Sequence, residues 1–284
     1  MTKAEPRLAI LAGRGSLPRR IAEHRRAHAL PTLVVAFQAL TEPWMADHPL
    51  ERHRFERPGR LFAALRRAGC TEIVFAGGME RPRLKPWAFD LTAVRLAARA
   101  LWLLRQGDDA MLRGFAAILE REGFCLRAAH DCLPGLTVPA AHLGRLRPSE
   151  ADRQDAARAG AILAALGPHD VGQAAVVARG VCLGIEAIEG TDALLARIAT
   201  LPPEKRAHAP PPAGVLVKCA KPGQDRRLDL PSIGPDTIAA AAAAGLAGIA
   251  VQAEAANIID RAATIAAADA AGLFLWSAPP EALS

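Results

Sequence analysis

Three short apolar runs at the start of the chain alternate with two segments of helical character, and this alternation limits the fold more than any other feature. The runs are residues 8–12, 32–37 and 71–76, and the helical segments are residues 19–28 and 59–68. Strands that alternate with helices form a parallel sheet whose faces the helices cover. The first part of the chain is therefore predicted to be a Rossmann-like α/β domain with a parallel sheet.

A stretch rich in proline and glycine separates this domain from the rest of the chain. Residues 134–148 hold three prolines and two glycines and have no clear helical period, which is typical of a linker between domains. We place the boundary there. Residues 1–147 are predicted to form the N-terminal domain with its hinge, and residues 148–284 to form a C-terminal domain that carries the metal and catalytic residues.

The second half has a different pattern of elements. Ser149 and Asp152 have the spacing of a capping box, which predicts the start of a helix. Strand-like runs at residues 174–178 and 181–188 meet at an Arg-Gly pair, which suggests a hairpin. Because later strand-like runs again alternate with helices, we expect a mixed α+β domain.

Charge is distributed unevenly between the two halves. Residues 1–147 contain 24 Lys+Arg and 14 Asp+Glu, and residues 148–284 contain 11 and 15, so the balances are +10 and −4. A basic half can face phosphates or an anionic membrane, and an acidic half can hold a divalent cation. Codon bias toward arginine is an alternative explanation of the total. We expect no nucleic-acid partner.

The cysteines and the hydropathy pattern indicate a cytoplasmic protein. None of the 5 cysteines forms a CxxC pair, so a disulfide scaffold and a zinc finger are not expected, and the thiols are predicted to be reduced. No run of 18 apolar residues and no secretory signal occur in the sequence. The chain is therefore expected to be soluble or peripheral to a membrane rather than to span one.

The first candidate for chemistry is a glycine-rich turn at residues 12–18, between a strand and a helix. Backbone N–H groups at the start of a helix can bind a phosphate. The dinucleotide fingerprint, however, needs a third glycine where Pro18 stands and an acid near Phe37. Contact with a nucleotide or phosphate of another kind is favoured over NAD, and a purely structural tight turn is the alternative.

A second glycine-rich segment, residues 75–82, follows the third predicted strand. In a parallel sheet it opens at the same edge as the first turn, where ligands bind. Arg81 in this segment can pair with a phosphate through its planar guanidinium. An ordinary surface charge is the alternative reading of Arg81.

Acidic residues gather in a third segment, residues 185–192. Glu186 and Glu189 fall on opposite faces if this segment is a strand, and Asp192 lies where it can cap the next helix. One of these acids can bind a metal or a sugar hydroxyl. A helix cap or a solvated face is the alternative for each of them.

A fourth segment places two of the 5 lysines, Lys218 and Lys221, shortly before Asp229. Asp229 stands between two leucines that should be buried, and a carboxylate in an apolar run is costly unless it is paired or binds a metal. Residues 234–237 then open a helix whose dipole favours anions. An acid, a lysine and a helix start are what cleavage of a phosphoanhydride needs; a simple cap is the alternative for Asp229.

These segments together resemble a known family. The carrying segments, in family order, are residues 12–18, 75–77 with 81–82, 107–113, 170–177, 186–192, 221–224 and 229–234. The chain is similar to the UDP-2,3-diacylglucosamine pyrophosphatases of the lipid A pathway, of the alphaproteobacterial type rather than the calcineurin-like type. The resemblance covers nearly the whole chain.

The resemblance implies two domains, a homodimer, and Mg²⁺-dependent attack of water on the diphosphate, at the phosphorus next to the sugar. Another oxygen-seeking cation such as Mn²⁺ would serve as well. Asp229 matches the family's metal-binding aspartate, and Lys221 is its predicted catalytic companion. The predicted substrate-binding residues are Gly13, Arg14, Ala76, Gly77, Arg81, Glu189, Gly190, Thr191 and Thr237.

The resulting hypothesis is a hydrolase that splits UDP-2,3-diacylglucosamine into UMP and 2,3-diacylglucosamine 1-phosphate. The alternatives are a nucleotide-cofactor oxidoreductase and a non-catalytic binder of nucleotide-sugars or lipids. Residues 91–105 mix leucines, a tryptophan and arginines, so they are expected to form a helix at the inner membrane surface or along an acyl-chain groove. An ordinary core helix is the alternative.

Overall fold

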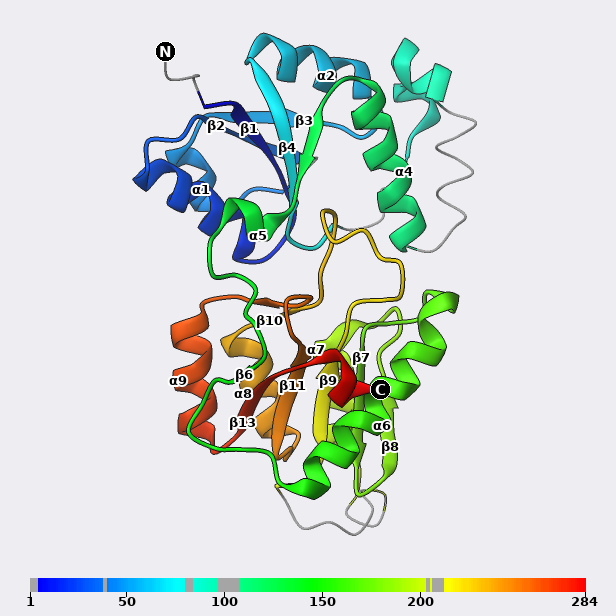
Figure 1. The fold of residues 1–284 in the computed structure, drawn as a ribbon. Coiled ribbons are helices and arrows are strands. Elements are labelled where there is room, and N and C mark those ends of the chain that lie inside the picture. The colour runs from blue at the N-terminus through cyan, green and yellow to red at the C-terminus, as the bar shows by residue number, and fades with distance from the viewer. Residues whose placement is uncertain (1–4, 38–39, 80–83, 97–107, 203–204, 206–211) are drawn as a thin grey trace. The chain divides into compact units, whose positions relative to one another are not determined.

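The computed structural model describes residues 5–37, 40–79, 84–96, 108–202, 205 and 212–284. The chain divides into two compact units (Figure 1). The first unit contains Met1–Pro134 and Asp225–Asp229, and the second contains Gly135–Gln224 and Leu230–Ser284.

The first unit is built on a sheet of five parallel strands in the order β3-β2-β1-β4-β5. Its strands are β1 (Arg7–Ala12), β2 (Thr32–Phe37), β3 (Leu50–His53), β4 (Cys70–Ala76) and β5 (Cys125–Arg127). The central strands are apolar and almost wholly buried, as strands covered on both faces should be. The predicted parallel α/β sheet is confirmed.

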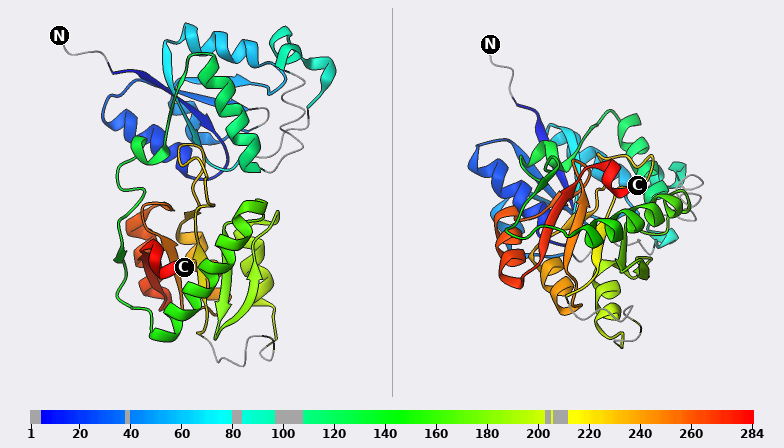
Figure 2. Two further views of the ribbon diagram at one scale, coloured as in Figure 1. Left: turned by 45° about the vertical axis from the view of Figure 1, so that its right-hand side comes forward. Right: turned by 60° about the horizontal axis from the view of Figure 1, so that its bottom comes forward.

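Helices lie on both faces of this sheet (Figures 1 and 2). The longer helices are α1 (Leu17–Ala27), α2 (Pro58–Arg67) and α4 (Asp108–Arg121), and the short ones are η1 (Pro43–Asp47), η2 (Pro86–Ala88) and α5 (Ala129–Cys132). Alternate strand residues such as Leu11 and Phe75 pack with Leu65 of α2 and Leu119 of α4. Helix α1 packs against β1 and β2.

The second unit contains a mixed sheet of six strands in the order β6-β13-β11-β9-β7-β8. Its strands are β6 (Ala141–His142), β7 (Ala174–Ala178), β8 (Val181–Ile185), β9 (Val215–Lys218), β11 (Gly248–Gln252) and β13 (Phe274–Ala278). Strands β9, β11 and β13 are parallel to one another, and the outer pairings are antiparallel. The expected mixed α+β character of this half is confirmed.

One face of the second sheet is covered by a single long helix and the other by three helices. The helices are α6 (Glu150–Leu166), α7 (Gly190–Ala199), α8 (Pro235–Ala243) and α9 (Arg261–Ala271), with the short η3 (Gly167–His169) and η5 (Pro280–Leu283). Leu163 of α6 belongs to one core, and Leu194, Ile238 and Ala268 belong to the other. A separate parallel pair joins β10 (Ser232–Ile233) and β12 (Asn257–Ile258).

Two local predictions in this unit are confirmed. Ser149 accepts a hydrogen bond from the N–H of Asp152, and the Asp152 carboxylate accepts one from the N–H of Ser149. The β7–β8 hairpin turns at Arg179 and Gly180, whose φ angles of 47° and 75° suit a tight hairpin turn. The buried carboxylate of Asp155 accepts both N–H groups of that turn.

The division between the units differs from the boundary expected between residues 147 and 148. The chain joins the second unit at Gly135, because its backbone there is used for pairing: the carbonyl of Leu136 accepts the N–H of Ile258, and β6 pairs with β13. From Gly135 onward, the stretch rich in proline and glycine is therefore an ordered part of the second unit and not a linker. Moreover, residues 225–229 return to the first unit.

The segment predicted as a surface or groove helix is described only in part. Residues 91–96 are helical, and the rest of the predicted helix lies outside the described residues. Within the part of the chain that the structure describes, no helix has the length and apolar character needed to cross a membrane.

Candidate active site

The two glycine-rich loops of the first unit lie side by side, as predicted for loops that leave neighbouring parallel strands at the same edge. The N–H of Arg14 donates to the carbonyl of Gly78 at 2.8 Å, and the N–H of Gly78 donates back to Arg14 at 3.0 Å. The N–H of Gly13 donates to the carbonyl of Ala76 at 2.7 Å. The predicted residues Gly13, Arg14, Ala76 and Gly77 are thus brought together by backbone contacts.

Two of these glycines are required by the close approach of the loops. A Cβ atom at Gly13 would lie 2.5 Å from the carbonyl oxygen of Gly78. Gly77 has a φ of 82°, and its Cβ would overlap the carbonyl of Arg14. Tight packing of the turn therefore explains both glycines, and their contact with a substrate stays a prediction. Arg14 is exposed, while the side chain of Ala76 is buried.

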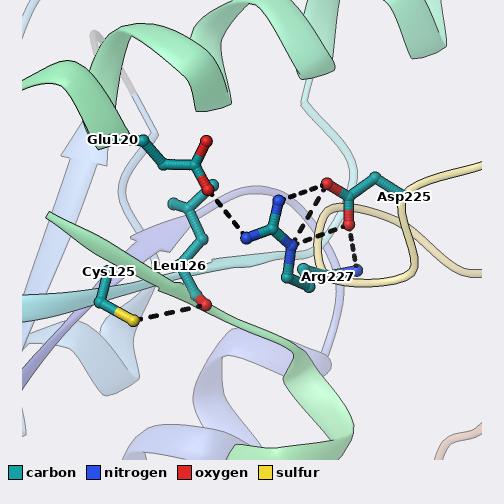
Figure 3. A network of polar contacts seen from close by, with 5 residues as sticks. All are labelled: Glu120, Cys125, Leu126, Asp225 and Arg227. Carbon is teal, nitrogen blue, oxygen red and sulfur yellow. Dashed lines mark hydrogen bonds and ion pairs between the residues drawn. The ribbon is translucent and has the colours of Figure 1, made fainter.

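Asp229 belongs to the first unit although most of the chain around it belongs to the second. The anchor of its segment is Leu228, which is 6% exposed and packs in the core formed by α2, α4 and the sheet. Arg227 adds polar contacts: its guanidinium bonds Glu120 of α4 at 2.8 Å and Asp225 at 2.7 Å (Figure 3). The buried Leu228 and the paired Arg227 thus hold the two positions directly before Asp229 in place.

The charges in this anchor stabilise one another. Hydrogen bonding to Arg227 holds the pKa of Asp225 below its ordinary value. The same bond, together with Glu120, raises the pKa of Arg227. Because the Arg227 side chain is 44% exposed, each pair contributes about 0–1 kcal/mol to stability. Leu228 is accordingly the larger part of the anchor.

Asp229 itself is exposed, whereas the leucines on either side of it are buried. The burial of Leu228 and Leu230 agrees with the sequence pattern. The carboxylate, in contrast, points out of the apolar run, so the expected cost of burying it does not arise. Its exposure leaves it accessible to a ligand from solvent.

The described residues offer few protein ligands to a divalent cation. Among the described residues, no group of three or more His, Cys, Asp and Glu side chains could hold a metal ion. Mg²⁺, however, commonly uses one or two carboxylates together with waters and substrate phosphates. The exposed carboxylate of Asp229 fits a cation that is held mainly by a diphosphate, and it does not fit an all-protein cage.

A network of polar side chains organises the candidate residues of the second unit. Lys218, at the end of β9, is 7% exposed and donates to the Thr191 hydroxyl at 2.8 Å and to the carbonyl of Ser232 at 3.1 Å. The Thr191 hydroxyl donates to a carboxylate oxygen of Glu186 at 2.6 Å. A buried lysine needs such partners, so Lys218 fixes Thr191 and the start of β10.

The network continues toward Lys221. The second carboxylate oxygen of Glu186 accepts the N–H of Gln173 at 2.9 Å. The amide of Gln173 donates to the side-chain oxygen of Gln224 at 3.0 Å, and that oxygen also accepts the N–H of Lys221 at 2.9 Å. The ammonium of Lys221 pairs with Asp170. Predicted residues Thr191 and Lys221 are thereby linked.

Three members of this network, Lys218, Gln173 and Gln224, are not among the predicted site residues. Lys218 stands in the fourth candidate segment, and both glutamines stand in segments that carry the family resemblance. A signal for Lys218 exists in the sequence, because it directly follows the apolar run of a buried strand and lysines are rarely buried. The two glutamines carry no comparable signal. Their positions depend on contacts between segments far apart in the chain.

The remaining predicted residues have local roles in the structure. Glu189 faces Arg197 of α7 at 4.0 Å, and Gly190 begins α7 with a φ of 81°. The Thr237 hydroxyl accepts the N–H of Gly234 at 3.3 Å and so caps α8. These contacts leave their substrate-binding roles as predictions. Arg81 lies outside the described residues.

The first unit also contains an apolar cavity of about 100 Å³. Six of the chain's 8 phenylalanines line it: Phe37, Phe55, Phe62, Phe75, Phe89 and Phe115. Arg54, which is exposed, is the one charged residue among the described residues of the lining. Apolar cavities of about this size offer water too few polar partners and accept apolar guests.

Both halves of the chain match models of one protein family. Residues 7–136 match the model of the LpxI N-terminal domain, and residues 139–276 match that of the LpxI C-terminal domain. The UDP-2,3-diacylglucosamine pyrophosphatase LpxI of Caulobacter vibrioides is 38% identical over 275 residues, which cover 97% of this chain and 98% of that protein. The chain therefore belongs to the LpxI family.

Proposed function

We propose that the protein hydrolyses the diphosphate of UDP-2,3-diacylglucosamine and releases UMP and 2,3-diacylglucosamine 1-phosphate in lipid A synthesis. The observation that carries this proposal is the 38% identity to a UDP-2,3-diacylglucosamine pyrophosphatase over 97% of the chain. A relationship that spans both units favours retention of the whole reaction rather than of one binding function.

In the proposed mechanism, the exposed carboxylate of Asp229 would hold a divalent cation. Mg²⁺, or Mn²⁺ in its place, would neutralise phosphate oxygens and lower the barrier to attack by water. Attack of water breaks one P–O bond of the anhydride, so that the water oxygen stays on one product and the bridging oxygen leaves with the other. We assign Lys221 to charge stabilisation, because its ammonium is already oriented by Asp170.

Polar and apolar features of the two units support the rest of the substrate assignment. The Glu186 carboxylate, which Thr191 and Gln173 orient, keeps acceptor capacity that suits a sugar hydroxyl. The apolar cavity of the first unit suits an acyl chain, which no NAD-type cofactor carries.

Two further parts of the proposal concern assembly and location. We infer a homodimer from the family resemblance alone. We also propose cytoplasmic action with peripheral contact at the inner membrane, because the substrate carries two acyl chains and residues 1–147 have a balance of +10. Each Lys or Arg near an anionic surface contributes about 1 kcal/mol, which decreases with salt.

The test is to incubate the purified protein with UDP-2,3-diacylglucosamine and to identify the products by mass spectrometry. Release of UMP and the sugar 1-phosphate in equal amounts supports the proposal. Binding of the substrate without release of UMP would leave a non-catalytic binder. Absorbance of bound NAD or flavin in the purified protein, without UMP release, would favour the oxidoreductase.

A further inference from the structure

Exposed apolar side chains are concentrated on one short segment of the first unit. Trp87 is 84% exposed, Leu91 79% and Val94 60%. The other strongly exposed large apolar residues of the described chain, Leu146, Val171, Val181 and Ile188, are spread over the second unit. Leu91 and Val94 are three apart in a helical stretch and so share one side of it. Apolar side chains that gather on a surface mark a contact site.

The segment is held firmly by the residues before and within α2. The Asp90 carboxylate accepts the N–H of Ala93 at 2.7 Å and the N–H of Gly59 at 2.9 Å, so it ties the start of the 91–96 helix to that of α2. The side chain of Glu56, which is buried, accepts the N–H of Lys85 at 3.2 Å. Exposure of Trp87 and Leu91 is therefore a property of an anchored structure.

The same helical stretch also forms a wall of the apolar cavity. Ala93 and Leu96 line the cavity, as do Leu84 and Phe89 just before them. Residues 84–96 thus present apolar groups to the cavity on one side and to solvent on the other. A surface that contacts lipid here would bring the rim of the cavity to the lipid.

The charges around the exposed residues suit an anionic partner. Lys85 and Arg95 are exposed within the segment, and Arg54 and Arg60 are exposed in and just before α2. Two acids among the described residues next to this segment are already engaged: Asp90 accepts backbone N–H groups, and Glu56 is buried. Tryptophan beside basic residues is typical of protein surfaces at the headgroup level of a bilayer.

We propose that residues 85–96 are the membrane-contact surface of this protein, and that Trp87, Leu91 and Val94 insert into the interfacial layer of an anionic bilayer. The surface holds the rim of the apolar cavity at the lipid, so that an acyl chain passes from the bilayer into the cavity. The passage of the acyl chain rests on the proposed function. The contact with lipid does not.

The lipid contact is tested by co-sedimentation of the full-length protein with vesicles of phosphatidylcholine, with and without phosphatidylglycerol. The test variant combines Trp87→Ser, Leu91→Ser and Val94→Ser. Its matched control combines Leu146→Ser, Val181→Ser and Ile188→Ser. We expect the wild type and the control to bind anionic vesicles and the test variant to bind about tenfold more weakly. Thermal unfolding checks that both variants are folded.

A second measurement follows the tryptophan directly. Vesicles should shift the emission of the wild type to shorter wavelength, and this shift should be lost in Trp87→Phe. Equal vesicle binding by the test variant and the wild type would overturn the proposal. So would a change in the gel-filtration volume of the test variant, because that result would make the surface a contact between protein chains.

The role in substrate access is separated from the proposed function by the form of the substrate. The test variant should release UMP from UDP-2,3-diacylglucosamine in detergent micelles at the wild-type rate, and about tenfold more slowly from vesicles. If the test variant and the wild type release UMP at equal rates from vesicles as well as from micelles, the role in substrate access is overturned. Absence of UMP release by the wild type in both would contradict the proposed function, while the sedimentation result would still decide the lipid contact.

Discussion

The two units of the molecule build their candidate residues in different ways. In the first unit the loops are joined by backbone hydrogen bonds, and glycines at positions 13 and 77 permit their close approach. In the second unit a chain of side chains from Lys218 to Gln224 fixes the geometry. The first unit should therefore be sensitive to the size of a substituted side chain, and the second to its polarity. Asp229 is the exception, because its proposed role depends on a side chain of the first unit.

The largest effect on activity is expected at Asp229. Asp229→Asn should lower the rate of UMP release about a thousandfold, because it removes electrostatic stabilisation of the transition state. Asp229 is exposed, so the variant is expected to fold, and thermal unfolding checks that it does. Glu150→Gln, an exposed acid at the start of α6, serves as the control. A rate above about a tenth of wild type would remove Asp229 from the metal site.

Polarity in the second unit is tested at its buried lysine. Lys218→Met should lower the free energy of unfolding by about 2–3 kcal/mol, because the Thr191 hydroxyl and the Ser232 carbonyl both lose a charged donor. Lys205→Met, at an exposed position, should leave it unchanged. The values come from urea unfolding. Equal stability of the two variants would mean that the network does not hold the second unit together.

The sensitivity of the first unit to side-chain size is tested at two neighbouring glycines, Gly77 and Gly78. Gly77→Ala should destabilise the protein by about 1–3 kcal/mol, since the new methyl group meets the Arg14 carbonyl and the φ of 82° is unfavourable. Gly78→Ala meets nothing within 4 Å and should change stability by less than about 0.5 kcal/mol. Urea unfolding of both variants decides this, and the reverse order would show that the loops are not closely packed.

A smaller, pH-dependent effect is expected at the anchor of Asp229. Arg227→Gln should cost less than about 1 kcal/mol at pH 7, because its partners are partly exposed. Arg227 lowers the pKa of Asp225. The pair therefore stabilises the folded protein at pH values above the unfolded pKa of Asp225, which is about 4. This stabilisation is lost as pH falls through the lower folded pKa.

The measurement for this anchor is urea unfolding of Arg227→Gln between pH 3 and pH 7, with the exposed Arg226→Gln as control. The difference in the free energy of unfolding between the two variants should become smaller toward pH 3. A constant difference across that range would assign the effect of Arg227 to something other than its pair with Asp225.

The smallest effect is expected from modification of thiols. Burial raises the pKa of Cys219 to about 12 and that of Cys132 to about 11, so both stay protonated near neutral pH. Cys125 and Cys182 are exposed and should react. Treatment with iodoacetamide should therefore leave UMP release within about twofold of the untreated rate. Inactivation of a protein that is still folded would indicate a cysteine in the mechanism.

Local patterns in the sequence predicted what depends on local physics. Alternation of strands and helices predicted the parallel sheet and the shared edge of the loops at Gly13 and Gly77, and the spacing of Ser149 and Asp152 predicted the start of α6. The return of Asp225–Asp229 to the first unit was not predictable in this way. It depends on the fit of Leu228 in a distant core and on the pairing of Arg227 with Glu120.

The apolar cavity and the surface beside it were also not predictable from local sequence patterns. The phenylalanines of the cavity are scattered from Phe37 to Phe115 in the sequence, so only the packed structure brings them together. The leucine-rich composition of residues 91–105 suggested a surface or a groove, without deciding between them. In the described part, Leu91 is exposed to solvent and Leu96 lines the cavity, and the contact with a membrane or an acyl chain stays a prediction.

The central claim is metal-assisted attack of water on a diphosphate, and one measurement tests it most directly. The protein is incubated with UDP-2,3-diacylglucosamine in ¹⁸O water, with Mg²⁺, with excess chelator, and with Mg²⁺ restored. We predict one ¹⁸O atom in a single phosphate product, loss of UMP release in chelator, and full recovery with Mg²⁺. Full activity in excess chelator, or products without ¹⁸O, would contradict the account.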